Sequence, residues 1–368
     1  MITNPVAKIK VIGVGGAGNN AVNRMVGVVQ GVEFIAVNTD KQDLAASQAD
    51  HKLAIGNKTT KGLGSGGNPA VGQKAAEESR EEIKAMLEGS DLVFVTAGMG
   101  GGTGTGASPI IAMAARELGI LTVGVVTKPF AFEAKHRMRN AEIGINNLSK
   151  FVDCTIVVPN QKLVEKTKQG TTMQEAFGIA DEVLRQGVQC ITDLIVKNMT
   201  INIDFADIEN VMRNSGIAHM GIGRARGEDR LLHAIQQAVQ SPMLETSIKG
   251  ASQIIMSVMG GNDLVIHEVD NYGNLIKGVV DDNCNIIFGL DIDPAFNEEV
   301  QIIIIATGFP LDERTQANLV HGTSEPPDAA VTSSKVSMHD NLQTQIEQNA
   351  RQTEDDLPPY IRKMREKK

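Results

Sequence analysis

Glycine residues and threonine hydroxyl groups dominate one stretch of ten residues, Ala97–Gly106, in which six residues are glycine. An apolar run typical of a buried strand, Leu92–Val95, precedes it. A helical pattern over Ala107–Leu118 follows it, with Pro109 expected in the first turn. A loop between a strand and a helix offers backbone N–H groups at the helix N-terminus, which favour an anion. The stretch therefore predicts a phosphate-binding loop, to which its two threonines add hydroxyl donors; a flexible surface loop is the alternative.

Two further glycine-rich loops occur in the first 110 residues. One carries G-x-G-x-x-G, which starts at Gly13 in a predicted strand at 8–14, and Asp40 follows about 20 residues later, as in dinucleotide-binding folds. The other is KGLGSGGNP at 61–69, and a helix is expected after it, over 71–87. A dinucleotide needs one such loop, whereas three suggest a nucleotide whose polyphosphate receives backbone donors from several loops. The pattern G-x-x-x-x-G-K-[ST] does not occur, so the usual phosphate-binding lysine is missing.

Two carboxylates lie on predicted helices near these loops. Glu133 and Arg137 are four residues apart at the start of a helix, so they share one face. They are either a surface ion pair or a pair that faces a ligand at the end of the sheet. Asp181 lies on a long predicted helix, 172–196, four residues after Phe177. Asp181 is either a solvated charge or an acceptor for the ring N–H and exocyclic amine of guanine, with Phe177 covering the base.

A separate polar cluster, formed by Asn202, Asp204 and Asp207, follows the long helix. Either carboxylate could cap a helix predicted over 208–214, and capping is the ordinary explanation. Two carboxylates and an amide can also position a water or hold a metal. The glycine loops contain no group that could act as a base, so this cluster is the best candidate for hydrolysis. It lies far along the chain, so it need not act on the chain's own phosphates.

The composition excludes several classes of protein. The chain has 368 residues and a net charge of −9, which argues against generic nucleic-acid binding. No apolar run reaches the roughly 18 residues that a membrane span requires, and the first residues lack a signal-peptide core. The three cysteines are far apart and odd in number, which indicates a reducing, cytoplasmic environment rather than a disulfide framework.

The elements that must position these groups form two α/β units joined by the long helix. Strands alternate with helices in the first unit, as in the βαβ units of an open α/β sheet. The second unit, 221–308, is a support domain with strands expected at 254–258, 264–269, 286–289 and 301–307. The polar stretch after it is typical of a disordered linker. The last residues space apolar side chains along a short helix, which would dock in a partner's groove; a solubilising basic tail is the alternative. The predicted boundaries are 1–170, 171–197, 198–309, 310–353 and 354–368.

Taken together, these segments resemble the FtsZ family, the tubulin-like GTPases of bacterial cell division. The matching segments, together with Asp181, are VIGVGGAGNNAVNRM (11–25), AVNTD (36–40), KGLGSGGNP (61–69), AGMGGGTGTGASP (97–109), TKPFAFE (127–133), NIDFAD (202–207) and DDLPPYIRK (355–363). The resemblance covers the chain except for the linker. It implies a Rossmann-like GTP-binding domain, a central helix, a smaller α/β domain, a disordered linker and a terminal partner-binding peptide.

The resemblance also implies roles for individual residues. The implied nucleotide contacts are Gly16, Ala17, Gly18, Asn19, Asn20, Gly102, Thr103, Gly104, Glu133, Arg137 and Asp181. Asn202, Asp204 and Asp207 would form the synergy loop, which enters the next subunit's nucleotide site and completes hydrolysis of GTP to GDP and phosphate. Mg²⁺ or another cation would accompany the nucleotide, and no metal ligand is assigned on the chain.

The same resemblance implies the partners and the location of the protein. Copies of the chain would associate head to tail into filaments, which are heterologous and therefore open-ended. The peptide 354–368 would bind membrane-tethering and regulatory division proteins. The protein would lie in the cytoplasm at the mid-cell division ring, with no membrane span and no nucleic-acid partner.

The chain departs from the family at a few positions, and two alternatives stay open: one follows from these departures, and the other rests on Gly13, Gly15, Gly18 and Asp40. Asn198-Met199-Thr200 stands where Pro-Gly-Leu is usual before the synergy loop, Ala17 replaces a common glycine, and Gln161 stands where an acidic residue is usual. A filament protein that binds GTP without hydrolysing it is therefore one alternative. An NAD-dependent oxidoreductase is the other, although it would need a second nucleotide-binding half and a hydride-handling residue, and the sequence shows neither.

Overall fold

The computed structural model describes most of the chain up to residue 309. The described residues are 7–164, 170–197, 199–201, 203–241, 248, 250–266, 268 and 284–309. Asn198 and Asn202 lie outside them, as do the predicted linker and terminal peptide.

Strands and helices alternate through the first half of the chain, as the sequence predicts. The strands are β1 (Ile9–Val14), β2 (Val32–Asn38), β3 (His51–Ala54), β4 (Leu92–Gly98), β5 (Leu121–Lys128), β6 (Cys154–Pro159), β7 (Gly216–Arg226), β8 (Gln253–Gly260), β9 (Asn285–Ile292) and β10 (Glu299–Thr307). The α-helices are α1 (Gly15–Met25), α2 (Lys41–Ala45), α3 (Asn57–Thr60), α4 (Pro69–Glu78), α5 (Arg80–Leu87), α6 (Thr103–Glu117), α7 (Ala134–Leu148), α8 (Asn160–Val164), α9 (Met173–Val196), α10 (Phe205–Met212) and α11 (Arg230–Val239). Two short 3-10 turns cover Ala131–Glu133 and Pro294–Phe296.

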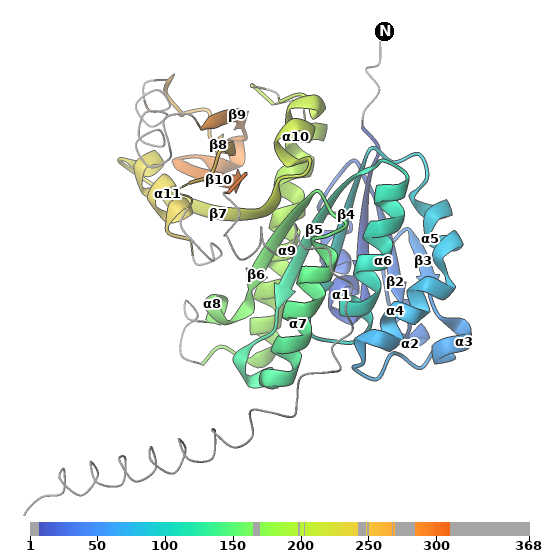
Figure 1. The fold of residues 1–368 in the computed structure, drawn as a ribbon. Helices are drawn as coiled ribbons and strands as arrows, with labels where there is room; N and C mark the ends of the chain where they lie inside the picture. Colours follow the sequence, from blue (N-terminus) through green and yellow to red (C-terminus); the bar gives the residue numbers. More distant parts are fainter. Residues whose placement is uncertain are drawn as a thin grey trace, which may run out of the picture. The chain divides into compact units, whose positions relative to one another are not determined.

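The described strands form one sheet in the order β3-β2-β1-β4-β5-β6-β7-β10-β8-β9 (Figure 1). From β3 to β6 all neighbouring strands are parallel. The sequence prediction of an α/β fold is therefore confirmed. This part follows the order 3-2-1-4-5-6 of doubly wound nucleotide-binding sheets, in which ligands bind outside the carboxyl ends of the strands where the order reverses. Here the order reverses between β1 and β4, the two strands that the glycine-rich segments at 13–18 and 97–106 follow.

Both faces of the parallel sheet are buried, which explains the continuous apolar runs in its strands. Successive side chains of a strand point to opposite faces. Val11 and Phe94 pack on one face with α1 and α9, and Ile12 and Val95 pack on the other with α4, α5, α6 and α7. Phe94 is fully buried, which stabilises the fold by about 1.5–3 kcal/mol relative to leaving it exposed.

The long helix α9 begins where the sequence places it. Thr172 caps it: the Thr172 hydroxyl accepts from the Glu175 amide at 3.2 Å, and the Glu175 carboxylate accepts from the Thr172 amide at 2.7 Å. At 24 residues the helix extends for about 36 Å. Neither α9 nor any other helix in the described ranges combines the length and apolarity that crossing a bilayer requires.

Strand β7 joins the parallel sheet to the antiparallel pairing beyond it, and the sequence analysis did not predict it. Its first residues pair in parallel with β6, and residues from His219 onward pair antiparallel with β10. Glycines interrupt its apolar pattern because α11 packs against the strand backbone. A Cβ on Gly221 would lie 2.0 Å from the Ala238 carbonyl oxygen, and one on Gly223 would lie 1.8 Å from that of Ala234.

Two local predictions are wrong. The helix expected over 71–87 is two helices, α4 and α5, that meet at Ser79. The strand expected at 264–269 is not found, because its described residues Ile266 and Glu268 are helical. The Glu268 amide donates to the Val265 carbonyl at 3.0 Å, and the Glu268 carboxylate pairs with the buried Arg230 guanidinium at 3.2 Å. This tertiary ion pair favours a turn over the strand that the apolar run suggested.

Candidate functional site

The glycine-rich stretch after β4 is half loop and half helix. Strand β4 ends at Gly98 and α6 begins at Thr103, so residues 103–106 form the first turn of the helix rather than a loop. The N-cap residue, Gly102, makes no side-chain cap, which leaves the N–H groups of this turn available to an anion. The expectation that Pro109 lies in the first turn is therefore wrong, because it is the seventh residue of α6.

Tertiary contact explains why a glycine-rich turn is helical despite its low helix propensity. Helix α4 crosses so close to α6 that a Cβ on Gly106 would lie 2.0 Å from the Pro69 carbonyl oxygen, and one on Gly72 would lie 2.3 Å from that of Gly102. Pro69 ends the glycine-rich loop at 61–69 and begins α4. The absence of Cβ atoms at Gly72 and Gly106 thus lets this loop lie against the start of α6.

Three hydroxyl groups join the glycine loops at the start of α6. The Thr103 hydroxyl lies 2.6 Å from that of Thr39, at the end of β2, and 3.0 Å from that of Ser65, in the loop at 61–69. Thr103 is buried. The glycine-rich segment after β1 also meets the start of α6, since a Cβ on Gly15 would lie 2.9 Å from the Gly104 amide nitrogen. We call residues 14–20, 61–68 and 98–103, with Thr39, the glycine-loop site. Thr39 and Ser65 were missed as site residues, although each stands beside a motif that the sequence shows.

The predicted contacts from Gly16 to Asn20 lie in the first two turns of α1, at the carboxyl end of β1. Gly16, Ala17 and Asn20 are exposed, whereas Gly18 and Asn19 are buried. Both polar atoms of the Asn19 side chain lack a hydrogen-bond partner, although the residue is only 3% exposed. A buried amide left unpaired costs about 1–3 kcal/mol, so such a group points to a ligand that would complete its hydrogen bonds.

Asp40 has a structural role at the start of α2. Its carboxylate accepts from the amide of Gln42 at 2.8 Å and that of Asp43 at 3.4 Å, and so caps the helix. Both bonds reach the same oxygen, Oδ1. The position of Asp40 after β2 is therefore explained by helix capping without a ribose ligand.

Glu133 and Arg137 form the i,i+4 ion pair, and Arg137 also lies against Gly100 and Gly101. The Arg137 guanidinium donates to the Glu133 carboxylate at 2.6 Å, and the second carboxylate oxygen accepts from the Phe130 amide at 2.9 Å. A Cβ on Gly100 would lie 2.7 Å from the Arg137 carbonyl oxygen, and one on Gly101 would lie 3.7 Å from its guanidinium. The ordinary and the functional interpretations are therefore compatible, because the pair is both an ion pair and a neighbour of the glycine-loop site.

Asp181 faces α1 and lies near an exposed aromatic cluster. The Arg24 guanidinium donates to its carboxylate at 3.1 Å. Burial raises the pKa of the Asp181 carboxyl above its ordinary value, and the Arg24 hydrogen bond and charge offset only part of that rise. Phe177 meets the rings of Phe130 and Phe132 edge to face, with centroids 5.1 and 6.2 Å apart. Phe177 is 42% and Phe132 is 55% exposed, so aromatic surface is available for a planar base.

Asp204 and Asp207 lie at the start of α10, and both are exposed. Asp204 occupies the N-cap position, yet its side chain makes no capping hydrogen bond. The ordinary explanation for this carboxylate, helix capping, therefore does not hold in the structure. The third member of the cluster, Asn202, lies outside the described residues. We call residues 203–207 the carboxylate loop.

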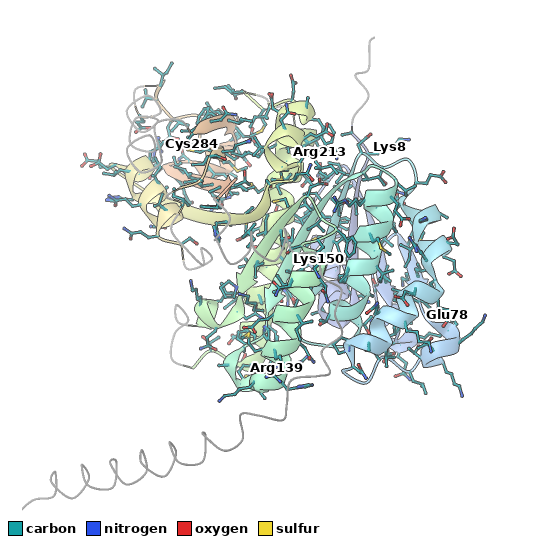
Figure 2. All side chains as sticks on the ribbon, in the orientation of Figure 1. Lys8, Glu78, Arg139, Lys150, Arg213 and Cys284 are labelled. Carbon is teal, nitrogen blue, oxygen red and sulfur yellow. The ribbon has the colours of Figure 1, made fainter. Side chains whose placement is uncertain are left out.

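The carboxylate loop and the glycine-loop site belong to opposite ends of the parallel sheet. The glycine loops follow the carboxyl ends of β1 and β4, whereas the backbone just after α10 bonds to the amino end of β6: the Gly216 amide donates to the Asp153 carbonyl at 3.0 Å. Figure 2 shows the same separation, with Arg213 beside α10 and Arg139 on α7 at the other end. The eight residues of β5 alone extend for about 26 Å. The two groups therefore do not meet within one chain.

Met199, one of the residues that differ from the usual family sequence before the carboxylate loop, is part of the hydrophobic core. Met199 is buried and belongs to the core cluster that α9 shares. Ile201 forms a two-way backbone bridge with Leu290 of β9, with N···O distances of 3.0 and 3.3 Å. The chain thus enters the carboxylate loop from a fixed point on β9.

Comparisons with known proteins match both parts of the chain. The Tubulin/FtsZ family GTPase domain matches residues 8–168, and the FtsZ family C-terminal domain matches residues 216–310. The chain is similar to an FtsZ from M. jannaschii, solved as an empty dimer, with 44% identity and a TM-score of 0.78 over 82% of this chain and 88% of that one. A mutant of the same protein gives 44% identity and a TM-score of 0.79 over 83% and 92%. CetZ1 from Haloferax volcanii, solved as a GDP-bound monomer, shares the fold at 22% identity, with a TM-score of 0.71 over 84% and 97%.

Proposed function

Since the chain belongs to the tubulin/FtsZ family of GTPases, we propose that it binds GTP in its glycine-loop site and hydrolyses it where two copies meet in a filament. The observation that carries the proposal is the separation of the carboxylate loop from the glycine-loop site. A chain that holds these two groups at opposite ends of its sheet can combine them only with another copy, head to tail. Such a contact is heterologous and extends into an open filament.

In the proposed nucleotide site, backbone N–H groups take the place of a phosphate lysine. The free N–H groups at the starts of α1 and α6 would donate to the phosphates through Gly16, Ala17, Gly102, Thr103 and Gly104. Gly18 and Asn20 would line the same site, and the unpaired Asn19 amide would gain a partner. Glu133 and Arg137 would line the same site. Asp181 would accept from the ring N–H and exocyclic amine of guanine, with the Phe177 ring against the base.

Hydrolysis would then use the carboxylate loop of the next subunit. Asp204 and Asp207, with Asn202, would orient a water whose oxygen attacks the γ-phosphorus, while the bond to the β–γ bridging oxygen breaks and GDP leaves with that electron pair. The backbone donors at the start of α6 would stabilise the charge on the transferred phosphoryl group. Both carboxylates are exposed and the Asp204 side chain is not engaged in capping, as this role requires.

A cation such as Mg²⁺ belongs to the proposal as a companion of the nucleotide. In the described ranges no three acidic, histidine or cysteine side chains gather as a metal-binding group. The phosphate oxygens of the nucleotide would hold the ion.

The wider biological role is also a proposal. The filaments would form the cytokinetic ring at the mid-cell division site, in the cytoplasm. Residues 1–170 would act as the GTP-binding domain, 171–197 as the central helix and 198–309 as the C-terminal domain. The peptide 354–368, tethered by 310–353, would bind membrane-tethering and regulatory division proteins.

The substitution Asp207→Ala tests the shared site. We expect the variant to bind GTP as the parent does, and to hydrolyse it about 100-fold or more slowly, which is the range for a lost acid–base or water-positioning group. Glu81→Ala removes an exposed carboxylate at the start of α5 and serves as the matched control. Normal hydrolysis by Asp207→Ala contradicts the proposal.

Mixing experiments assign the defect to one side of the contact. Asp207→Ala keeps its nucleotide site, and Asp181→Ala keeps its carboxylate loop, so a mixture of the two should recover turnover that neither shows alone. Turnover per molecule of the parent should also rise with concentration, since the site needs two copies. Turnover that stays flat on dilution contradicts the shared site, whereas light scattering and phosphate release seen with GTP but not with NAD separate the proposal from an oxidoreductase.

A further inference from the structure

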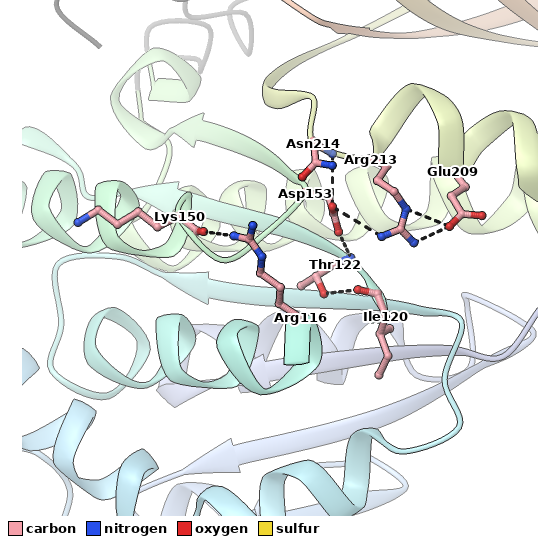
Figure 3. Close-up of polar contacts among 8 residues, drawn as sticks. All are labelled: Arg116, Ile120, Thr122, Lys150, Asp153, Glu209, Arg213 and Asn214. Carbon is pink, nitrogen blue, oxygen red and sulfur yellow. Dashed lines mark hydrogen bonds and ion pairs between the residues drawn. The ribbon is translucent and has the colours of Figure 1, made fainter. Parts of the chain in front are cut away.

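The end of α10 is fastened to the parallel sheet through one acidic residue, Asp153, which precedes β6 (Figure 3). Its backbone pairs with the start of β5, since the Asp153 amide donates to the Thr122 carbonyl at 2.8 Å. Its side chain repeats this link, because one carboxylate oxygen accepts from the Thr122 amide at 2.9 Å. Both the backbone and the side chain of Asp153 are therefore hydrogen-bonded to Thr122 on the sheet.

The second carboxylate oxygen of Asp153 reaches the residues that follow α10. It accepts from the Asn214 amide at 3.3 Å and lies 4.0 Å from the Arg213 guanidinium. Asn214 has a φ of 53°, a left-handed conformation that a side-chain-bearing residue adopts only at some cost. The bond to Asp153 stabilises this turn, through which the chain leaves α10 and enters β7.

Arg213 extends the link back along the helix. Its guanidinium donates to the Glu209 carboxylate at 3.0 and 2.5 Å, so it connects Asp153 to a residue two positions after Asp207 (Figure 3). Helix α10 has eight residues, or about 12 Å, and its buried side chains pack against the core. A rigid helix of this length transmits a displacement of its last turn to its first, where the carboxylate loop lies.

We propose that Asp153, with Arg213, is a positioning residue that sets the placement of the carboxylate loop and thereby controls GTP hydrolysis in the next subunit. The inference rests on the proposed function, because it concerns the same two carboxylates. Asp153 lies at the end of the sheet that is remote from the glycine loops. Its loss should therefore leave nucleotide binding intact and affect only the catalytic contribution that this chain makes to its neighbour.

The test is turnover by Asp153→Asn, which keeps the side-chain shape but replaces one acceptor oxygen with a donor, and by Arg213→Gln. A displacement of about 1 Å can cost about 100-fold in rate, so we expect each variant to lose about tenfold or more in GTP turnover per polymerised subunit while its GTP affinity is unchanged. Arg116→Ala is the matched control. Arg116 lies at the same end of the sheet and donates to the Lys150 carbonyl at 2.5 Å, with no bond to α10 in the described structure (Figure 3). Its turnover should equal that of the parent.

Mixtures distinguish positioning from a general loss of structure. Asp153→Asn mixed with Asp181→Ala should recover turnover, because the second variant supplies an intact carboxylate loop. Asp153→Asn mixed with Asp207→Ala should recover none, because both are defective on the same side. Turnover of Asp153→Asn and Arg213→Gln equal to that of the Arg116→Ala control overturns the inference, and so does recovery in the mixture with Asp207→Ala. If Asp207→Ala alone hydrolyses GTP normally, the proposed function itself has failed.

Discussion

Replacing Gly106 with alanine tests whether the contact between α4 and α6 builds the glycine-loop site. In a helix without close neighbours, this change stabilises the fold by about 0.5–1 kcal/mol. At Gly106 the added Cβ would lie 2.0 Å from the Pro69 carbonyl oxygen and 2.6 Å from the Gln73 amide nitrogen, whereas real Cβ atoms essentially never approach closer than 3.0 Å. Both obstacles are backbone atoms, so no rotamer change relieves them and one helix must move by about 1 Å or more. Overpacking of this kind costs about 1–3 kcal/mol. Less the helix-propensity gain of about 0.5–1 kcal/mol, we expect a net destabilisation of about 1 kcal/mol.

Urea unfolding of the nucleotide-free protein measures this change as a lower midpoint at an unchanged slope. Gly178→Ala, in α9, is the matched control, because its added Cβ would meet only the end of the flexible Arg24 side chain, at 3.2 Å. That variant should be as stable as the parent or slightly more stable. Gly106→Ala should also bind GTP more weakly, since the shift carries Ser65 away from Thr103. A Gly106→Ala protein as stable as Gly178→Ala refutes the reasoning.

Four further predictions concern the site and the long helix. Burial raises the pKa of the Asp181 carboxyl, which must be ionised to accept from guanine. GTP affinity should therefore fall with decreasing pH, and the fall should begin at a higher pH than the protonation of an exposed aspartate. The same raised pKa means that the contribution of Asp181 to the stability of the unliganded protein increases as the pH falls, and Asp181→Asn should remove both pH dependences. Arg24→Ala removes the partly offsetting charge and should move the loss of GTP affinity to higher pH, as a binding titration measures. Thr103→Val deprives two neighbouring hydroxyls of their partner and should cost about 1–2 kcal/mol in urea unfolding, whereas Thr103→Ser should restore most of it. Thr172→Ala breaks the capping box of α9 and should cost about 1 kcal/mol in the same assay, with a smaller effect in a Glu175→Ala background.

The sequence predicted most of the parallel sheet and the position of its glycine loops. Continuous apolar runs such as Leu92–Val95 identify strands buried on both faces, and a glycine run directly after a strand marks the turn into a helix. The apolar stripe of α9 and its N-terminus at Thr172 are equally local signals. These patterns are readable because each depends on neighbours within a few residues, where backbone sterics and side-chain periodicity act.

The helix start at Thr103 and strand β7 were decided by tertiary contacts. Local propensity favours a loop over residues 103–106, but the approach of α4 makes the glycines an advantage and the turn becomes helical. Glycines in β7 conceal a strand because they admit α11 against its backbone. The turn out of α10 depends likewise on Asp153, which lies 61 positions before Asn214 in the printed sequence.

The sequence by itself determined the chemistry available to this protein: backbone donors for phosphates, a carboxylate and aromatic rings for a base, and two further carboxylates with no phosphate lysine. It also determined the family, through motifs spread along the chain. Only the tertiary structure decided where these groups lie, and it places the glycine loops and the carboxylate loop at opposite ends of one sheet. The physical reason is that strand direction and sheet order, which fix the end at which each loop emerges, arise from pairing between segments far apart in the chain.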